Sequence, residues 1–320
     1  MEKCTILILA GGYAQEPVVP DGIQWRTKRK GEPSCLTFTA IKDDLLSFPE
    51  GAEVTFQYGD KKVFSGYVFE KHRNKDHHIE VTCYDRTRYF KNKENYVFTG
   101  LRADQIISRI AADLGIRVGH LTNTGYAIPK FAKADCTIWD IIKEALDLTT
   151  MVTGVPYTVY DDYGSICLKS MEEMMSDCYI DQDVAEDFDY TTSIDECTYN
   201  QIVVKVDDGD TIVVEDTSEN STLTQWGLLQ YVTDAKNAEN ARVKANALLK
   251  MHNQVSRSLA INGAFGNIEV RAGSSVFLHL NLGDKEMNQS MLVEEVTHTF
   301  DKGHHYMDLT LTDGRGFYIE

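Results

Sequence analysis

The feature that most constrains the fold of this chain is one order of residue types that occurs twice, about 220 residues apart. The first copy, "GAEVTFQYGDKKVFSGYVFEKHRNKDHHIEVTCYD", begins at Gly51. The second, "GSSVFLHLNLGDKEMNQSMLVEEVTHTFDKGHHYMDLTLTD", begins at Gly273. Apolar and polar residues alternate in both copies between turn-forming residues such as Gly-Asp, which predicts short antiparallel strands. The chain is therefore expected to build one kind of β unit twice.

Aligning the two copies pairs residues of the same type in the same order. We take six residues as the repeat and assembly positions and expect the two sheets to superpose on them: Val54, Asp60 and Asp85 in the first copy, Val276, Asp284 and Asp313 in the second. The alignment also pairs Val68-Phe69-Glu70 with Leu292-Val293-Glu294, His72 with His298, His77-His78 with His304-His305 and Thr82 with Thr310. The alternative is that two unrelated β-meanders share valines, Gly-Asp turns and threonines by composition alone.

The net charge of the chain limits the kinds of partner that it can bind. Its 320 residues carry 32 Lys and Arg against 49 Asp and Glu, a formal net charge of −17, with a hydrophobic fraction of 42%. That apolar content is typical of a folded protein, and the length favours more than one unit. The acidic excess disfavours binding to phosphate backbones or anionic membranes, so we expect no specific nucleic-acid binding.

The cysteines and the first apolar run indicate an intracellular product. Seven cysteines are scattered without a Cys-x-x-Cys pair, which is typical of reduced, mostly buried thiols. The run "CTILILA" from Cys4 is too short for a signal or membrane segment, and we expect a first strand there.

The periodicity divides the chain into four predicted regions. The fold class is α+β, mostly β, with two similar β-barrel domains at residues 1–98 and 190–320. A small α/β domain at 99–171 and an acidic linker at 172–189 lie between them. A helix near 235–253 is inserted in the second barrel domain, and "NQIVVKVDDGDTIVVED" reads as a hairpin with its turn at Asp208 and Gly209.

Two helices and a hairpin are predicted within 99–171. Apolar residues with helical spacing form one face that ends before Gly115: Ala103, Ile106, Ile107, Ile110, Ala111 and Leu114. A second helix begins at "TIWD", where Thr137 can cap and Asp140 stands at the third helical position. The stretch "YTVYDDYGSICLKS" predicts a hairpin that turns around Gly164.

Motifs for catalysis or cofactor binding are weak. Adjacent histidines on a strand point to opposite faces, so neither His-His pair is expected to hold a metal ion. The acidic run "DDGDTIVVEDTSE" fits a hairpin better than a calcium loop, and "LAGGYA" lacks the third glycine and the helix of a phosphate loop. We therefore predict no catalytic, cofactor-binding or metal-binding residues and no enzymatic activity.

The order of these units resembles the baseplate hub proteins of contractile phage tails. The resemblance rests on a β unit followed by "ADQIISRIAADLGI" and "TIWDIIKEALDLT", then "SIDECTYNQIVVKV", then "NAENARVKANALLK" leading to "IEVRAGSSVFL". It is strongest to the late-control-protein-D-like group of the XkdQ/YqbQ type and covers nearly the whole chain.

This resemblance implies a structural adaptor with two tail-tube-like barrels per subunit. It implies a homotrimer in the baseplate of a virion or phage-tail-like particle, assembled in the bacterial cytoplasm, that joins a sixfold tail tube to a trimeric central spike. The expected partners are the tail tube protein, the spike protein and baseplate wedge proteins. The alternatives are a cell-wall-active enzyme or carbohydrate-binding protein, and an adaptor of the type VI secretion spike class.

Overall fold

The structure is a computed structural model that describes residues 2–20, 22–43, 45–76, 78–181, 187–195, 197–206, 212–216, 221–235, 238–283 and 286–313. The chain divides into two compact units. Unit 1 comprises Met1–Asp189 and Ala260–Ile319, and unit 2 comprises Tyr190–Leu259. No helix in the described part of the chain has the length and apolarity needed to span a membrane.

The first strand set of unit 1 is an antiparallel sheet with the order β3-β4-β7-β6-β5-β1-β2. Alternate side chains of its strands are buried, as the period-2 pattern predicts, and large apolar residues such as Leu36, Phe38 and Phe56 fill its core. Its strands are β1 (Cys4–Ala10), β2 (Tyr13–Gln15), β3 (Ile23–Lys28), β4 (Cys35–Ile41), β5 (Glu53–Tyr58), β6 (Lys61–Arg73) and β7 (His78–Tyr84).

A helix-containing region follows and has its own core. Its elements are η1 (Arg86–Lys91), β8 (Lys93–Arg102), α1 (Ala103–Asp113), β9 (Arg117–Leu121), β10 (Ala127–Thr137), α2 (Ile138–Thr153), β11 (Tyr157–Asp162) and β12 (Ser165–Ser170). β8 pairs with β10, and β12 lies between β11 and β9. The inner faces of α1 and α2 pack together in one apolar cluster.

The sequence predicted this region well. The helical face from Ala103 to Ala111 is buried, and Leu114 is partly buried against the same core. Thr137 caps α2 by accepting a hydrogen bond from the Asp140 backbone N–H at 3.1 Å. The hairpin β11–β12 turns at Gly164, which has a positive φ of 92° that favours glycine.

The second strand set consists of β13 (Met175–Asp181), β14 (Asp187–Ser193), β18 (Ser256–Phe265), β19 (Ser275–Asn281), β20 (Glu286–Asp301) and β21 (His304–Thr312). β13 lies within the predicted acidic linker, and this part of the linker is a strand because Cys178 and Ile180 alternate into the core. The opposite face of β13 carries the exposed residues Met175, Asp177 and Tyr179, which make the alternation difficult to recognise in the sequence.

Unit 2 is a small α/β unit. Its elements are β15 (Gln201–Val206), β16 (Ile212–Asp216), α3 (Ser221–Trp226), β17 (Gln230–Ala235) and α4 (Ala238–His252). β15 pairs antiparallel with β16, as the predicted hairpin requires, and parallel with β17. The predicted turn at Asp208 and Gly209 lies outside the described residues. The predicted helix near 235–253 is α4, which packs against β15, β16 and β17.

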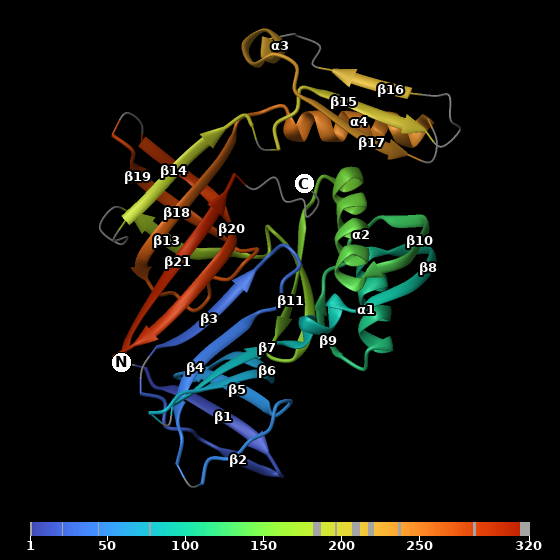
Figure 1. Cartoon of the computed structure of the whole chain (residues 1–320). Helices are drawn as coiled ribbons and strands as arrows, with labels where there is room; N and C mark the ends of the chain where they lie inside the picture. The colour runs from blue at the N-terminus through green and yellow to red at the C-terminus, as the bar shows by residue number, and fades with distance from the viewer. Residues whose placement is uncertain are drawn as a thin grey trace. The chain divides into compact units, whose positions relative to one another are not determined.

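Among the described residues, both strand sets belong to one sheet of 13 strands, because β3 of the first set pairs with β20 of the second (Figure 1). In place of two closed barrels, the pairing among the described residues follows an open path from β14 to β2. The physical reason is that β3 uses its outer edge to pair with the second strand set. That edge is therefore not available to close the first strand set into a barrel. The four-region division by sequence stays a prediction.

Candidate assembly site

The joint between the two strand sets is an antiparallel ladder in which six residues of β3 face six of β20, from Lys28 opposite Glu295 to Ile23 opposite Phe300. The Arg29 N–H extends the ladder by donating to the Glu294 carbonyl at 2.9 Å. A ladder of this kind fixes the relative position of the strands, because a slip of one residue would turn every buried side chain outward.

A buried ion pair closes one end of this joint. The Arg29 guanidinium donates to the two Glu294 carboxylate oxygens at 3.0 and 2.8 Å, and the Arg29 side chain is only 2% exposed. Two parallel charge-assisted hydrogen bonds make this geometry strongly directional. Around it, Lys28 and Arg26 make longer ion pairs with Glu295, at 3.3 and 3.9 Å, on a more exposed part of the surface.

His298 lies in the middle of the joint and is fully buried. Its ring stacks on Trp25 of the opposite strand, with the ring centroids 5.0 Å apart. His298 Nε2 lies 2.8 Å from the Val270 carbonyl oxygen, and a carbonyl can only accept, so Nε2 carries the proton. Nδ1 therefore accepts a hydrogen bond from His305 Nε2, 2.9 Å away.

Burial lowers the pKa of His298 to about 3 and the pKa of His305 to about 4. For His298, the neighbouring His305 and Arg271 lower it further, whereas the hydrogen bond to Val270 opposes the shift. Both rings are thus neutral at pH 7 and act as fixed hydrogen-bonding groups of the core. His304, the other member of its His-His pair, is exposed on the opposite face of β21, as the sequence predicted.

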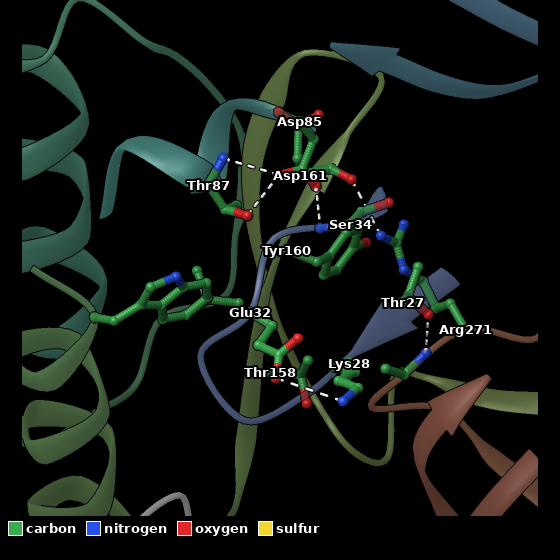
Figure 2. Close-up of a pocket in the computed structure, with 13 residues that line it drawn as sticks. Thr27, Lys28, Glu32, Ser34, Asp85, Thr87, Thr158, Tyr160, Asp161 and Arg271 are labelled. Atoms are coloured by element: carbon green, nitrogen blue, oxygen red, sulfur yellow. Dashed lines mark hydrogen bonds and ion pairs between the residues drawn. The ribbon is translucent and has the colours of Figure 1, made fainter. Parts of the chain in front are cut away.

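A second buried polar cluster joins the strand sets to the helix-containing region (Figure 2). Asp85 caps η1 by accepting hydrogen bonds from the Thr87 N–H at 3.0 Å and the Thr87 hydroxyl at 2.5 Å. Its other carboxylate oxygen accepts from the Ser34 N–H at 3.2 Å. Asp161, at the end of β11, accepts from the backbone N–H groups of Arg86 and Gly164.

The two carboxyl groups line one small cavity. Burial raises the pKa of Asp85 to about 8, with the charge of Asp161 adding to the shift, and burial also raises the pKa of Asp161, to about 6. Arg271 lies over the ring of Tyr160, 3.9 Å from its centroid, and donates to the Asp161 carbonyl at 3.1 Å. The hydrogen bonds of Asp85, Asp161 and Arg271 therefore connect segments that lie far apart in the sequence.

This cavity has a volume of about 20 Å³, room for about one water molecule. Small-molecule sites typically measure about 300–1,000 Å³. Three polar atoms of its lining make no hydrogen bond within the described part of the chain: Trp139 Nε1, Thr158 Oγ1 and Arg271 Nε. The arrangement is that of a packed structural junction, because a substrate does not fit.

The predicted assembly positions do not converge on one site. Val54 and Val276 are fully buried in different strands, and Asp60 is exposed in the β5–β6 turn. Asp85 belongs to the buried junction, and Asp313 directly follows β21. Asp284 lies outside the described residues. Among the described residues, no group of three or more His, Cys, Asp and Glu could hold a metal ion, and no two cysteines form a disulfide.

The pairing register shows how the two strand sets correspond. Val54 lies opposite Gly66, and Val276 opposite Met291. The Gly51 N–H donates to the Val68 carbonyl at 2.8 Å, and the Gly273 N–H donates to the Val293 carbonyl at 2.8 Å. Each set then has an irregularity at the next residue, between Val68 and Glu70 in one and between Val293 and Glu295 in the other.

This register moves part of the sequence alignment by one residue. Val68 corresponds to Val293 rather than Leu292, so Phe69 corresponds to Glu294, and Arg73 rather than His72 corresponds to His298. The strand pairing matches Thr82 with Thr310 and Asp85 with Asp313, as the sequence alignment does. The sequence analysis did not identify Arg29, Trp25 and Asp161 as partners in these contacts, because no local pattern in the sequence marks them.

The fold is that of phage tail proteins. A tail protein from Neisseria meningitidis MC58 superposes with a TM-score of 0.74 at 11% identity, covering 98% of each chain. The chain is also similar to the Escherichia coli c3393 protein, described as a type VI secretion component that resembles T4 tail proteins gp27 and gp5, with a TM-score of 0.57 and 11% identity over 98% of this chain and 79% of that one.

The family follows from the sequence. The model described as YQBQ-like matches residues 23–312, so the chain belongs to the YQBQ-like family. A relative from Bacillus subtilis (strain 168), the phage-like element PBSX protein XkdQ, is 29% identical over 304 residues, which cover 93% of this chain and 92% of that protein. The resemblance noted from the order of motifs is thereby confirmed.

Proposed function

We propose that this protein is a structural baseplate hub of a contractile phage tail or a phage-tail-like particle. The observation that carries the proposal is that the chain contains two strand sets with the same pairing order, β1-β5-β6-β7-β4 and β13-β19-β20-β21-β18. The sets differ at one end, where β1 pairs antiparallel with β5 and β13 pairs parallel with β19. Both sets also occur in the same order along the chain, with unit 2 inserted between β14 and β18. Duplication of one tail-tube-like domain accounts for all of these similarities.

A duplicated domain solves a problem of symmetry. A ring of three copies with two equivalent domains each presents six similar surfaces, so a trimeric spike can be joined to a sixfold tube. The family membership and the fold of phage tail proteins support this role. In this proposal the protein is a homotrimer whose partners are the tail tube, the central spike and baseplate wedge proteins, and each strand set forms a tube-like barrel domain with its neighbours.

The proposed role is not enzymatic. The junction cavity of about 20 Å³ supports a structural function, because the buried carboxyl groups that line it cannot reach a substrate. Purified protein is expected to leave a peptidoglycan zymogram unchanged. A cleared band that a control protein purified in the same way does not produce would favour the cell-wall-active alternative.

Electron microscopy of the native particle tests the hub role. Antibody labelling is expected to place the protein in the baseplate, at the end of the tail tube. Labelling along the sheath or at the capsid, or no labelling of any particle, would contradict the proposal.

The second candidate function is an adaptor of a type VI secretion spike. The similarity to the fold of the E. coli c3393 protein favours it. The two candidates differ in their particle: a phage or phage-like tail contains a baseplate that is released on lysis, whereas a secretion apparatus stays attached to the cell envelope. Fractionation of the native host followed by immunoblotting distinguishes them.

A further inference from the structure

A second pocket of unit 1 lies where β6, η1 and the end of α1 meet, and its volume is about 220 Å³. It is lined by Tyr67, Arg86, Tyr89, Asn92 and the turn 114–116 that follows α1. Sites for whole small molecules typically measure about 300–1,000 Å³, whereas a cavity of about 150 Å³ is enough to bind benzene. This pocket therefore has room for one aromatic ring.

Aromatic rings continue from the pocket across the surface of the sheet. We call this series the aromatic cluster, and its members are Tyr67, Phe69, Tyr84 and Tyr89. The ring centroids of Tyr67 and Tyr89 are 6.4 Å apart, and Phe69 lies 6.3 Å from Tyr89 and 5.4 Å from Tyr84. Edge-to-face contacts of this kind hold aromatic side chains in defined orientations. Tyr89 is nevertheless 36% exposed, so the cluster can be reached from outside.

Arg86 is a fixed part of the pocket wall. Its guanidinium lies over the Tyr67 ring, 5.3 Å from the centroid, donates to the Ser65 hydroxyl at 3.1 Å and pairs with Glu53 at 3.4 Å. A Cβ atom at Gly164 would lie 2.7 Å from a guanidinium nitrogen, so glycine leaves the space that Arg86 occupies. A wall that is already ordered costs less conformational entropy when a partner binds.

Two cations beside the cluster lack an acidic partner. Arg88 and Lys91 are in the last turn of η1, and Arg88 lies over the Phe69 ring, 5.5 Å from its centroid. Within the part of the chain that the structure describes, neither residue forms an ion pair. Although the whole chain has a net charge of −17, this surface therefore presents positive charge that its own side chains do not neutralise.

Polar atoms at the pocket are also available to a partner. The Tyr67 and Tyr89 hydroxyls and the Asn92 side-chain amide make no hydrogen bond to the described residues. Tyrosine and arginine are enriched among the few residues that supply most of the binding energy of protein–protein interfaces. The composition of this surface is thus typical of a protein-binding site.

We propose that this pocket binds an aromatic side chain of another protein of the particle, flanked in that protein by Asp or Glu. The ring contacts Tyr67 and Tyr89, and the carboxylates neutralise Arg88 and Lys91. This inference rests on the proposed hub function, which supplies the particle, and it adds the chemistry of one partner. Nucleic acid is not the proposed ligand, because the acidic excess of the chain repels a phosphate backbone.

Peptide titration of the isolated chain tests the pocket without the particle. The probe is a blocked pentapeptide, Asp-Glu-Phe-Glu-Asp, and calorimetry measures its affinity. Replacing its Phe by Ala, or its four acidic residues by Lys, is expected to weaken binding at least about 10-fold. Failure of the acidic Phe peptide to bind, or equal affinity for the three peptides, would overturn the proposal and leave the hub function standing.

Matched variants assign the binding to this surface. Tyr89→Ala is expected to weaken binding of the acidic Phe peptide at least about 10-fold, whereas Tyr306→Ala, at a tyrosine that is also 36% exposed, should leave it unchanged. Arg88→Gln with Lys91→Gln should weaken it at least about 3-fold, and the control is exposed Lys130→Gln, outside the pocket lining. Thermal unfolding checks that each variant is folded. Equal affinities of the folded variants and their controls would overturn the assignment.

Photo-crosslinking in native particles tests the partner. A benzoylphenylalanine placed at position 89 is expected to crosslink to a different protein of the particle, through a segment in which mass spectrometry finds an aromatic residue beside Asp or Glu. Crosslinks to a second copy of this chain, to nucleic acid or to a segment without acidic residues would overturn the proposed partner. Absence of the chain from particles would reject the hub function, and the peptide titration then decides the pocket by itself.

Discussion

The two strand sets share one backbone plan but use their edges differently. In the second set the outer half of β20 is covered by β3, and the residue at its irregularity, Glu294, makes a buried ion pair. In the first set the corresponding half of β6 has no strand on that side among the described residues, and the corresponding residue, Phe69, packs against Tyr84 and Tyr89. A duplicated sheet can therefore use one edge to hold the chain together and leave the equivalent edge without a strand partner in the same chain.

The largest expected effect is a difference in unfolding free energy between variants at the two irregularities, Glu294 and Phe69. Glu294→Ala leaves the Arg29 guanidinium buried without its carboxylate, which should cost about 3–5 kcal/mol of unfolding free energy. Phe69→Ala at the equivalent position should cost about 1–2 kcal/mol, because Phe69 is only half-buried. Chemical denaturation of both variants measures the difference.

The control replaces both partners of the ion pair. Arg29→Met with Glu294→Leu should restore most of the stability lost in Glu294→Ala, because no charge is then left buried. Equal losses for Glu294→Ala and Phe69→Ala would show that the ion pair does not hold this edge.

Equivalent core positions should respond equally. Val54→Ala and Val276→Ala each remove two methyl groups from a fully buried side chain, so each should lower the unfolding free energy by about 2 kcal/mol. Thermal or urea unfolding followed by tryptophan fluorescence gives both values. A loss at one position and none at the other would break the equivalence of the two sets.

Part of the pH dependence should come from His298 of the second set. The pKa of His298 in the folded chain is about 3, below its ordinary value of 6.5, so between these values the unfolded chain binds the proton and the folded chain does not. Stability should therefore fall as the pH decreases from about 6.5 toward 3, by at most about 1.4 kcal/mol per pH unit from this residue.

His298→Phe should reduce that slope while preserving an aromatic ring against Trp25. The matched control is Arg73→Ala at the equivalent position of β6, which removes no group that titrates in this range. Urea unfolding at a series of pH values measures the slopes. An unchanged slope in His298→Phe would mean that His298 does not contribute to the acid sensitivity.

The smallest effect is expected at the exposed turn of the first set. Asp60→Ala changes a solvent-exposed side chain between β5 and β6, so its unfolding free energy should stay within about 0.5 kcal/mol of the wild type. A larger loss, measured by urea unfolding, would show that the Gly-Asp turn stabilises the sheet through contacts of the carboxylate.

Local patterns in the sequence predicted the local structure. The buried face of α1, the Thr137 cap of α2 and the turn at Gly164 follow from spacing and backbone preference, which act between residues close in the chain. The order of the repeat also pairs Val54 with Val276, and the superposition of the two sheets on these positions stays a prediction.

The partners across the joint could not be predicted from the sequence. Arg29 and Glu294 are 265 residues apart, and no periodicity relates an arginine after one strand to a glutamate in another. The prediction of two similar β-barrel domains is not confirmed, because strand alternation does not specify which edges meet. β13 was missed because only two of its side chains, Cys178 and Ile180, are buried, and they lie in an acidic stretch of the sequence.

A reconstruction of the native particle by cryo-electron microscopy, at a resolution that traces strands, tests the central claim most directly. The hub proposal predicts three copies around the tail axis, with their six strand sets related by near-sixfold symmetry. Six copies or one copy at the baseplate, or strand sets that do not follow one another around the axis, would contradict it.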